Sequence, residues 1–176
     1  MTSEQDELLN AGEASARDPD RDPEHDSARF RVGVFAVIEI TGMERETRYL
    51  LARRADIGWW NLVGGGLEYD ETPEEGLARE AREEIGAEIA VIRLVGVYAK
   101  PPKREVVLTY LCRLALDSPA PTTSEEVSEV GVFTLAELPD DLLPKHRQRV
   151  LDAASGQMEA FRRTQATSSA EDQRRT

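Results

Sequence analysis

The stretch GGGLEYDETPEEGLAREAREEIGAEI, residues 64–89, joins three consecutive glycines to a segment rich in carboxylates. A helix start follows the glycines, with Thr72 as the N-cap and Pro73 at the first helical position. Glu75 completes a capping box, and Gly86 is a natural C-terminal stop. The stretch therefore predicts a glycine loop followed by a helix between Thr72 and Gly86.

The predicted helix carries an acidic stripe beside its apolar stripe. Each helical residue advances about 100°, so that relative to Glu80, Glu84 lies near about +40° and Glu83 near about −60°. A solvated helix face would explain such a stripe, because like-charge repulsion in water costs only tenths of a kcal/mol. The neighbouring glycines and Arg79 favour a different interpretation, a site for Mg²⁺ or Mn²⁺, which prefer hard oxygen ligands. The apolar stripe predicted to face the core consists of Leu77, Ala78, Ala81 and Ile85.

The remaining sequence is mostly β-forming. Strands are predicted at 29–40, 48–55, 87–99, 104–116 and 126–135, with a short strand entering the glycines. One helical turn is predicted at 135–139 and an amphipathic helix at 143–154. Strands with a helix in mid-chain and another near the end predict a mixed α/β domain of the α+β type, whose strand order the sequence does not reveal.

The chain has 176 residues, which is typical of one domain. Residues 1–28 and 161–176 are rich in charged and small residues, so they are predicted to be disordered arms around a folded domain at 29–160. Cys112 is the single cysteine and lies in an apolar run, so an internal disulfide is excluded and a buried thiol is expected.

The net charge of −12 limits the possible partners. An acidic protein repels nucleic-acid backbones, so an extended nucleic-acid groove is not expected, whereas a cation could still mediate binding of a small phosphate-bearing substrate. No segment approaches the roughly 20 apolar residues of a membrane helix, and the first residues lack an apolar signal core. We therefore expect a cytoplasmic protein without membrane contact, as a monomer or homodimer.

One family pattern matches the acidic stretch. Gly65, five residues, Glu71, seven residues and then the run REAREEIGA, residues 79–87, resembles the Nudix box at every fixed position. The preceding segment WNLVGGGLE resembles the segment that usually leads into the box in this family. Val63 stands where a proline is common, and Asp70 stands where a glycine usually precedes the second glutamate. The resemblance covers about residues 30–155.

The resemblance implies a Nudix-like α/β/α sandwich with a mixed sheet. It also implies an enzyme that uses Mg²⁺ or Mn²⁺ to hydrolyse a nucleoside diphosphate linked to another moiety. Glu83 and Glu84 correspond to the principal metal ligands of the family, Glu80 to a ligand of a further ion, and Gly65 to a ligand through its carbonyl oxygen.

Two further roles follow from the resemblance. Glu71 would fold back on Arg79 and hold the loop against the helix rather than take part in chemistry. Glu126 lines up with a glutamate of the family's late loop that often removes a proton from the attacking water, with Glu125 and Glu129 as neighbouring alternatives.

Substrate contacts are less specific. Arg53 and Arg54 alternate along a strand, so only one of them can face a cleft and contact phosphate. Of the adjacent Trp59 and Trp60, one is expected in the core and the other stacked on a base, with Trp60 as the candidate for the substrate contact. Other candidates have simpler interpretations as surface residues: Lys100, Lys103 and Arg104 in a loop, and His146 on a helix.

Several nucleotide substrates fit the motif. Pro101 and Pro102 resemble a feature of ADP-ribose pyrophosphatases, whereas the compact domain is similar to hydrolases of nucleoside triphosphates, and dinucleoside polyphosphates are a third class. The alternative is a non-catalytic nucleotide-sensing module, but such modules often lose the glutamates that this chain keeps.

Overall fold

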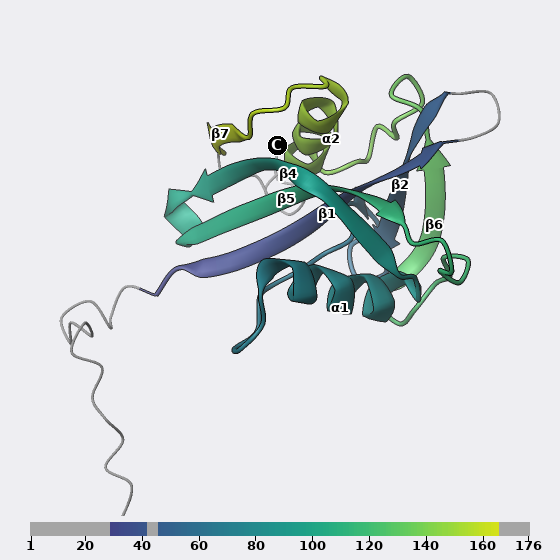
Figure 1. Ribbon diagram of the computed structural model, residues 1–176, viewed down its shortest axis with the longest axis horizontal. Coiled ribbons are helices and arrows are strands. Elements are labelled where there is room, and N and C mark those ends of the chain that lie inside the picture. The colour runs from purple at the N-terminus through teal and green to yellow at the C-terminus, as the bar shows by residue number, and fades with distance from the viewer. Residues whose placement is uncertain (1–28, 42–45, 166–176) are drawn as a thin grey trace, which may run out of the picture.

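The computed structural model describes residues 29–41 and 46–165, which fold around a mixed seven-stranded sheet (Figure 1). The strands are β1 (Arg31–Thr41), β2 (Thr47–Arg54), β3 (Trp60–Asn61), β4 (Ile89–Lys100), β5 (Glu105–Leu114), β6 (Val127–Phe133) and β7 (Phe161–Thr164). Their order is β3-β2-β1-β5-β4-β7, and β6 also pairs with β2. The β1–β5 and β4–β7 pairs are parallel, and the other pairs are antiparallel.

Two α-helices cover opposite faces of this sheet, α1 (Pro73–Ile85) below it and α2 (Pro144–Ala154) above it in Figure 1. A 3-10 helix, η2 (Pro101–Lys103), joins β4 to β5. The α/β/α sandwich expected from the sequence is therefore confirmed. No helix in the described parts of the chain is both long and apolar enough to cross a bilayer.

The helix α1 begins and ends at the predicted residues. The Glu75 amide donates to Thr72 Oγ1 at 3.3 Å, and the Thr72 amide donates to Glu75 Oε2 at 2.8 Å, so the capping box is complete. Gly86 adopts a left-handed φ of 63° at the C-cap, a conformation that glycine adopts at little cost. Local sequence alone therefore determines the bounds of the helix that carries the acidic stripe.

Strand β1 supplies both hydrophobic cores by alternating its side chains, as a strand with two covered faces must. Val34, Ala36 and Ile38 are fully buried on the α1 side, together with Leu77, Ala81 and Ile85 of the predicted stripe, whereas Ala78 is only partly buried. Val37 faces the α2 side. Cys112 is buried in the α1-side core, as expected.

The glycine loop runs beside the first half of β1 in place of a neighbouring strand. The amides of Val34 and Ala36 donate to the carbonyls of Gly65 and Val63 at 2.8 and 2.9 Å. At Gly64, φ is 133° and an added Cβ would lie 2.1 Å from the Val34 carbonyl oxygen, so only glycine fits. These contacts place the loop next to α1.

Two predictions about the later chain are wrong. The segment 135–139 forms a turn instead of a helical turn, with the Glu137 amide donating to the Thr134 carbonyl at 3.2 Å. Residues 161–165 belong to the folded domain, because β7 pairs with β4 and Gln165 is buried. Both expected arms otherwise lie outside the described residues.

Strand β7 is held by a buried carboxylate on α2. Asp152 is 3% exposed and accepts hydrogen bonds from Arg163 Nε at 2.7 Å and Arg163 Nη2 at 2.6 Å. It also accepts from the Tyr98 hydroxyl and the Gln148 amide, both at 2.9 Å. The sequence of β7, FRRT, has too few apolar residues for its hydrophobic pattern to predict that it packs against the domain.

We expect Arg163→Ala to lower the free energy of unfolding by about 1–2 kcal/mol, because Asp152 stays buried with fewer donors. Arg162→Ala, an exposed change in the same strand, should alter it by less than about 0.5 kcal/mol. Denaturant titration measures both values, and equal losses would contradict the role given to Arg163.

Candidate active site

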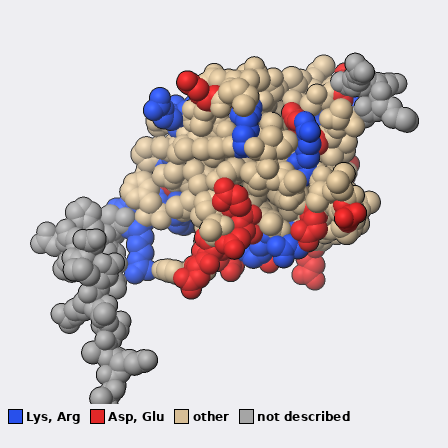
Figure 2. Space-filling view, in the orientation of Figure 1, with Lys and Arg blue, Asp and Glu red and all other residues tan. Residues whose placement is uncertain are grey.

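A cavity of about 740 Å³ opens where the glycine loop, α1 and the start of α2 meet. Its wall brings together most of the residues singled out in the sequence. They are Gly65, Arg79, Glu80, Glu83 and Glu84 from the box, Arg54 from the end of β2, and Glu125 and Glu126 from the segment before β6. Figure 2, in the orientation of Figure 1, shows Asp and Glu side chains gathered over the region of α1.

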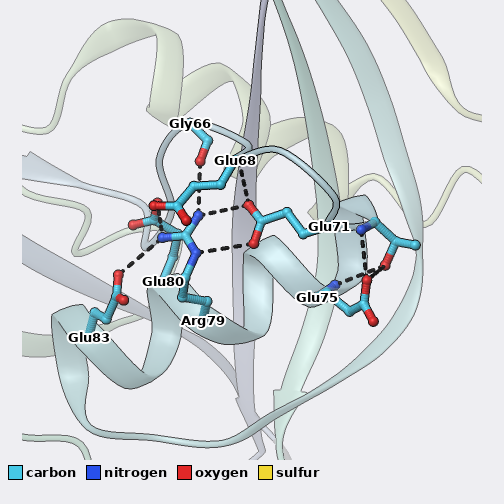
Figure 3. Close-up of polar contacts among 8 residues, drawn as sticks. Gly66, Glu68, Glu71, Glu75, Arg79, Glu80 and Glu83 are labelled. Atoms are coloured by element: carbon cyan, nitrogen blue, oxygen red, sulfur yellow. Dashed lines mark hydrogen bonds and ion pairs between the residues drawn. The ribbon is translucent and has the colours of Figure 1, made fainter. Parts of the chain in front are cut away.

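Arg79 connects the glycine loop to the helix (Figure 3). Its Nε and Nη2 donate to the two oxygens of Glu71 at 3.1 and 2.9 Å, and Nη2 also donates to the Gly66 carbonyl at 3.0 Å. The Glu68 amide donates to Glu71 at 2.7 Å. The contact expected from the resemblance is therefore present, and the Arg79 guanidinium lowers the pKa of Glu71.

The same guanidinium holds two carboxylates of the acidic stripe. Arg79 Nη1 donates to Glu80 Oε1 at 3.0 Å and to Glu83 Oε2 at 3.1 Å. Glu71 approaches α1 closely enough that a Cβ on Gly76 would lie 2.7 Å from its Oε1. This contact explains why a glycine stands inside the helix, where it costs about 1 kcal/mol relative to alanine.

Glu84 lies beyond the reach of this clamp. It is 9% exposed, and its Oε2 accepts a hydrogen bond from the Gly64 amide at 3.0 Å. Burial raises the pKa of Glu84 to about 7, and the charges of Glu80 and Glu126 add to the effect. Burial also raises the pKa of Glu80. Two carboxylates of the stripe are thus destabilised in their charged form, which a bound cation would relieve.

The donor atoms at this end of the cavity fit a hard divalent cation. Gly65 has no side chain, and a Cβ there would lie 2.5 Å from Glu80 Oε1, so the missing side chain lets a carboxylate lie against the loop backbone. The donors are carboxylate and carbonyl oxygens, which Mg²⁺ and Mn²⁺ prefer. In the described residues no three Asp, Glu, His or Cys side chains converge on one point, since Glu80 and Glu83 are turned toward Arg79.

The late loop contributes Glu125 and Glu126 but not Glu129. The Ala55 amide donates to the Glu126 carbonyl at 2.8 Å and fixes this segment against the end of β2. Glu129 lies on β6 and pairs with Arg53 at 3.3 Å, away from the cavity wall.

The structure places Trp60 and Arg53 away from the cavity, so it does not support the substrate contacts expected of them. The two residues are paired across β2 and β3, and Arg53 Cζ lies 5.8 Å from the Trp60 ring. Trp60 is 5% exposed and packs edge-on against Phe133 at 5.0 Å. Successive strand residues point to opposite faces, so only Arg54 faces the cavity.

His146 is buried, contrary to the surface position expected. It is 3% exposed, lines the cavity and accepts a hydrogen bond from the Leu62 amide through Nδ1 at 3.0 Å. The sequence could have indicated this burial, because His146 is the first residue of a set spaced i, i+3, i+4, i+7, which lies on one face of a helix. The buried positions of α2 on that stripe are His146, Arg149, Val150 and Ala153. Lys145 and Asn61 also line the cavity and were not singled out.

Comparison with known proteins agrees with this arrangement. The family model described as "NUDIX domain" matches residues 29–153. A "MutT-like protein" of Streptomyces ambofaciens is 39% identical over 114 residues, which cover 65% of this chain and 73% of the relative. An "ADP-ribose pyrophosphatase" of Methanocaldococcus jannaschii is 29% identical over 120 residues, covering 65% and 71%.

A solved structure shows the same fold. The crystal structure of a NUDIX hydrolase from Nitrosomonas europaea superposes with a TM-score of 0.67 at 26% identity, covering 79% of this chain and 80% of that one. The family match spans most of the chain and includes the glycine loop, the Arg79 clamp and the acidic helix. The chain therefore belongs to the Nudix hydrolase family.

Proposed function

We propose that this protein is a divalent-metal-dependent pyrophosphohydrolase. Its substrate would be a nucleoside diphosphate linked to another moiety, such as a nucleoside triphosphate or ADP-ribose. The observation that carries the proposal is the grouping of Glu80, Glu83, Glu84 and Glu126 in one cavity, with Glu84 buried and Glu80 partly buried. The relative named as an ADP-ribose pyrophosphatase supports the nucleotide class of substrate.

Glu80, Glu83, Glu84 and the Gly65 carbonyl would hold Mg²⁺ or Mn²⁺. When bound, such a cation neutralises diphosphate charge and lowers the pKa of a coordinated water. The Gly65 carbonyl accepts one hydrogen bond from the Val34 amide, which orients it and leaves its second lone pair available. Binding through Glu83 and Glu80 requires both side chains to turn away from Arg79.

Arg79 and Glu71 would position the ligands without touching substrate. Their contacts hold the loop backbone against α1, which fixes Gly65 relative to the acidic stripe. Glu126 would accept the proton of the attacking water, because it lines the cavity and lies close enough for its charge to raise the pKa of Glu80 and Glu84. Arg54, also on the wall, would contact phosphate oxygens.

The first expectation is metal dependence. Removal of divalent cations with EDTA should abolish release of phosphate products from a panel of nucleoside triphosphates, ADP-ribose and dinucleoside polyphosphates. Added Mg²⁺ or Mn²⁺ should restore it, since the α1 carboxylates cannot bind a polyanion alone. Full turnover in metal-free buffer would refute the proposal, and nucleotide binding without turnover would instead favour a sensing module.

The second expectation separates a ligand from a cap residue on the same helix. Glu84→Gln should lower kcat by about 100-fold or more, because it removes a charge from the cation site. Glu75→Gln keeps a side chain that can cap the helix, and should change kcat little. Steady-state rates on the best substrate compare the two variants, and equal losses would contradict the assignment of Glu84.

Without metal, Glu84→Gln should also change the melting temperature of the protein in a way that depends on pH. Burial holds the folded-state pKa of Glu84 at about 7, above its ordinary 4.5, so stability from the protonated form is lost as the pH rises through about 7. Glu84→Gln stays neutral, so in EDTA its melting temperature at pH 8 should equal or exceed that of the wild type. The difference should shrink as the pH falls toward 4.5.

The third expectation uses two adjacent glycines. Gly65→Ala would place a Cβ 2.5 Å from Glu80 Oε1, whereas Gly66→Ala would meet nothing within 4 Å. Because misplaced catalytic groups are costly, kcat should fall by about 10- to 100-fold for Gly65→Ala only. Rates at saturating Mg²⁺ test this, and a loss confined to Gly66→Ala would show that the loop acts differently.

A further inference from the structure

The cavity has a second, basic end opposite in charge to the metal-binding stripe. The chain contains three lysines, Lys100, Lys103 and Lys145, and every other basic residue among its 22 is an arginine. All three lysines line this cavity. Lys100 and Lys103 lie close together at the end of β4 and in η2, and the fold brings Lys145 to them from the first turn of α2. We call these three residues with His146 the basic end.

Negative charge at the basic end is scarce. Lys100 pairs with Glu105 at 2.5 Å, and this is the only ion pair that any of the three lysines makes within the described residues. Burial lowers the pKa of Lys145 to about 8, and the charges of Lys100, Lys103 and Arg149 add to the effect. The Lys145 ammonium therefore lies in a partly desolvated position beside other cations, which an anion would stabilise.

Arg149 increases this excess from behind the cavity wall. It is 0% exposed, and its Nε and Nη1 have no hydrogen-bond partner among the residues that the structure describes. Its Cζ lies 5.1 Å from the rings of both Phe35 and Tyr98, and Phe35 lines the cavity. Its hydrogen-bond partner is the neutral amide of Gln165, at 2.9 Å. A buried guanidinium without a carboxylate is costly, and negative charge bound nearby would offset that cost.

The basic end also offers a directed neutral donor. Nδ1 of His146 accepts from the Leu62 amide, and burial keeps the pKa of His146 well below its ordinary value. The imidazole is therefore neutral with its proton on Nε2, which is a donor. His146 is nearly fully buried yet lines the cavity, and no acceptor within the described residues pairs with this proton. Lys145 precedes it at the start of the eleven-residue α2, whose N-cap makes no side-chain hydrogen bond.

The two ends of the cavity are electrostatically distinct. The charges that shift the pKa of Glu84 belong to Glu80, Glu126 and Arg54. Those that shift the pKa of Lys145 belong to Lys100, Lys103, Arg149 and Glu105. The two sets share no member, although Arg54 also lowers the pKa of His146. An anion held by the lysines and a cation held by the acidic stripe would therefore use different charged side chains.

We propose that the basic end binds a phosphate monoester on the part of the substrate remote from the cleaved diphosphate. This proposal rests on the proposed function for the location of the cleaved bond. A phosphate dianion matches several ammonium groups and the His146 donor, whereas an uncharged base would offer no charge to balance Lys103 and Lys145. The preferred substrates would then be nucleoside diphosphate derivatives that carry an additional phosphate.

Binding in EDTA tests the anion site without metal or catalysis. Under these conditions the acidic stripe repels phosphate, so AMP should bind through the basic end and adenosine should bind at least about 10-fold more weakly. Lys145→Gln should weaken AMP binding by about 10-fold, and Arg113→Gln, an exposed change on β5, should not. Calorimetric titration measures the affinities. AMP binding that is insensitive to Lys145→Gln, or equal binding of adenosine, would overturn the proposal.

A second arm, with Mg²⁺ present, tests the additional phosphate. Adenosine 3′,5′-bisphosphate should bind about 10-fold more tightly than AMP, and Lys145→Gln should remove this gain. Inorganic phosphate is the control for a free anion. If it bound as tightly as the bisphosphate, and if Lys145→Gln weakened both equally, the basic end would be a site for free phosphate. The proposal that it binds a phosphate of the substrate would then be wrong. If no substrate were hydrolysed but both Lys145-dependent effects remained, the proposed function would fail while the anion site stood.

Lysine labelling of the wild-type protein gives a readout that does not depend on how a variant folds. Acetylation with an N-hydroxysuccinimide ester, followed by peptide mass spectrometry, reports the reactivity of Lys103 and Lys145 separately. Adenosine 3′,5′-bisphosphate should protect both lysines severalfold, and adenosine should protect neither. Equal labelling with and without the bisphosphate would overturn the proposal.

Discussion

The contact between Arg79 and Glu71 is the constraint on which the arrangement of the candidate site depends. It joins a loop that precedes α1 to the middle of that helix, and it is supported by hydrogen bonds to the Gly66 carbonyl and from the Glu68 amide. Without it, the hydrogen bond from the Gly64 amide to Glu84 would be left to anchor the glycine loop on the acidic face of α1. Because the same guanidinium reaches Glu80 and Glu83, one cation both shapes the loop and balances the charge of two candidate ligands.

The clamp leaves one carboxylate uncompensated. Glu84 is nearly buried and accepts a single hydrogen bond from the Gly64 amide, so its ionised form is unstable without a further cation. Ionised Glu84 is therefore electrostatically unfavourable in the metal-free site, and metal binding would stabilise it. The basic end presents the opposite imbalance, with an excess of positive charge around Lys145. A substrate that places phosphates at both ends, with a divalent cation at one of them, would neutralise both.

The sheet topology explains why these groups meet. The first half of β1 is flanked by β5 on one side and by the glycine loop on the other, so the loop takes the place of a strand there. Although α1 and α2 lie on opposite faces of the sheet, residues of both helices line the cavity beside this loop. The acidic residues thus come mainly from one helix, whereas the basic end combines β4, η2 and α2.

The sequence by itself determined the bounds of α1 and its acidic stripe, because caps and helical periodicity act over a few residues. The pairing of Glu71 with Arg79 was implied by the resemblance to the Nudix box. Only the tertiary structure decided that Arg54 rather than Arg53 faces the cavity and that Trp60 is buried, since both depend on the register between strands. The same holds for β7 and for the approach of Lys145 to Lys100 and Lys103, because non-local packing brings the start of α2 next to the end of β4.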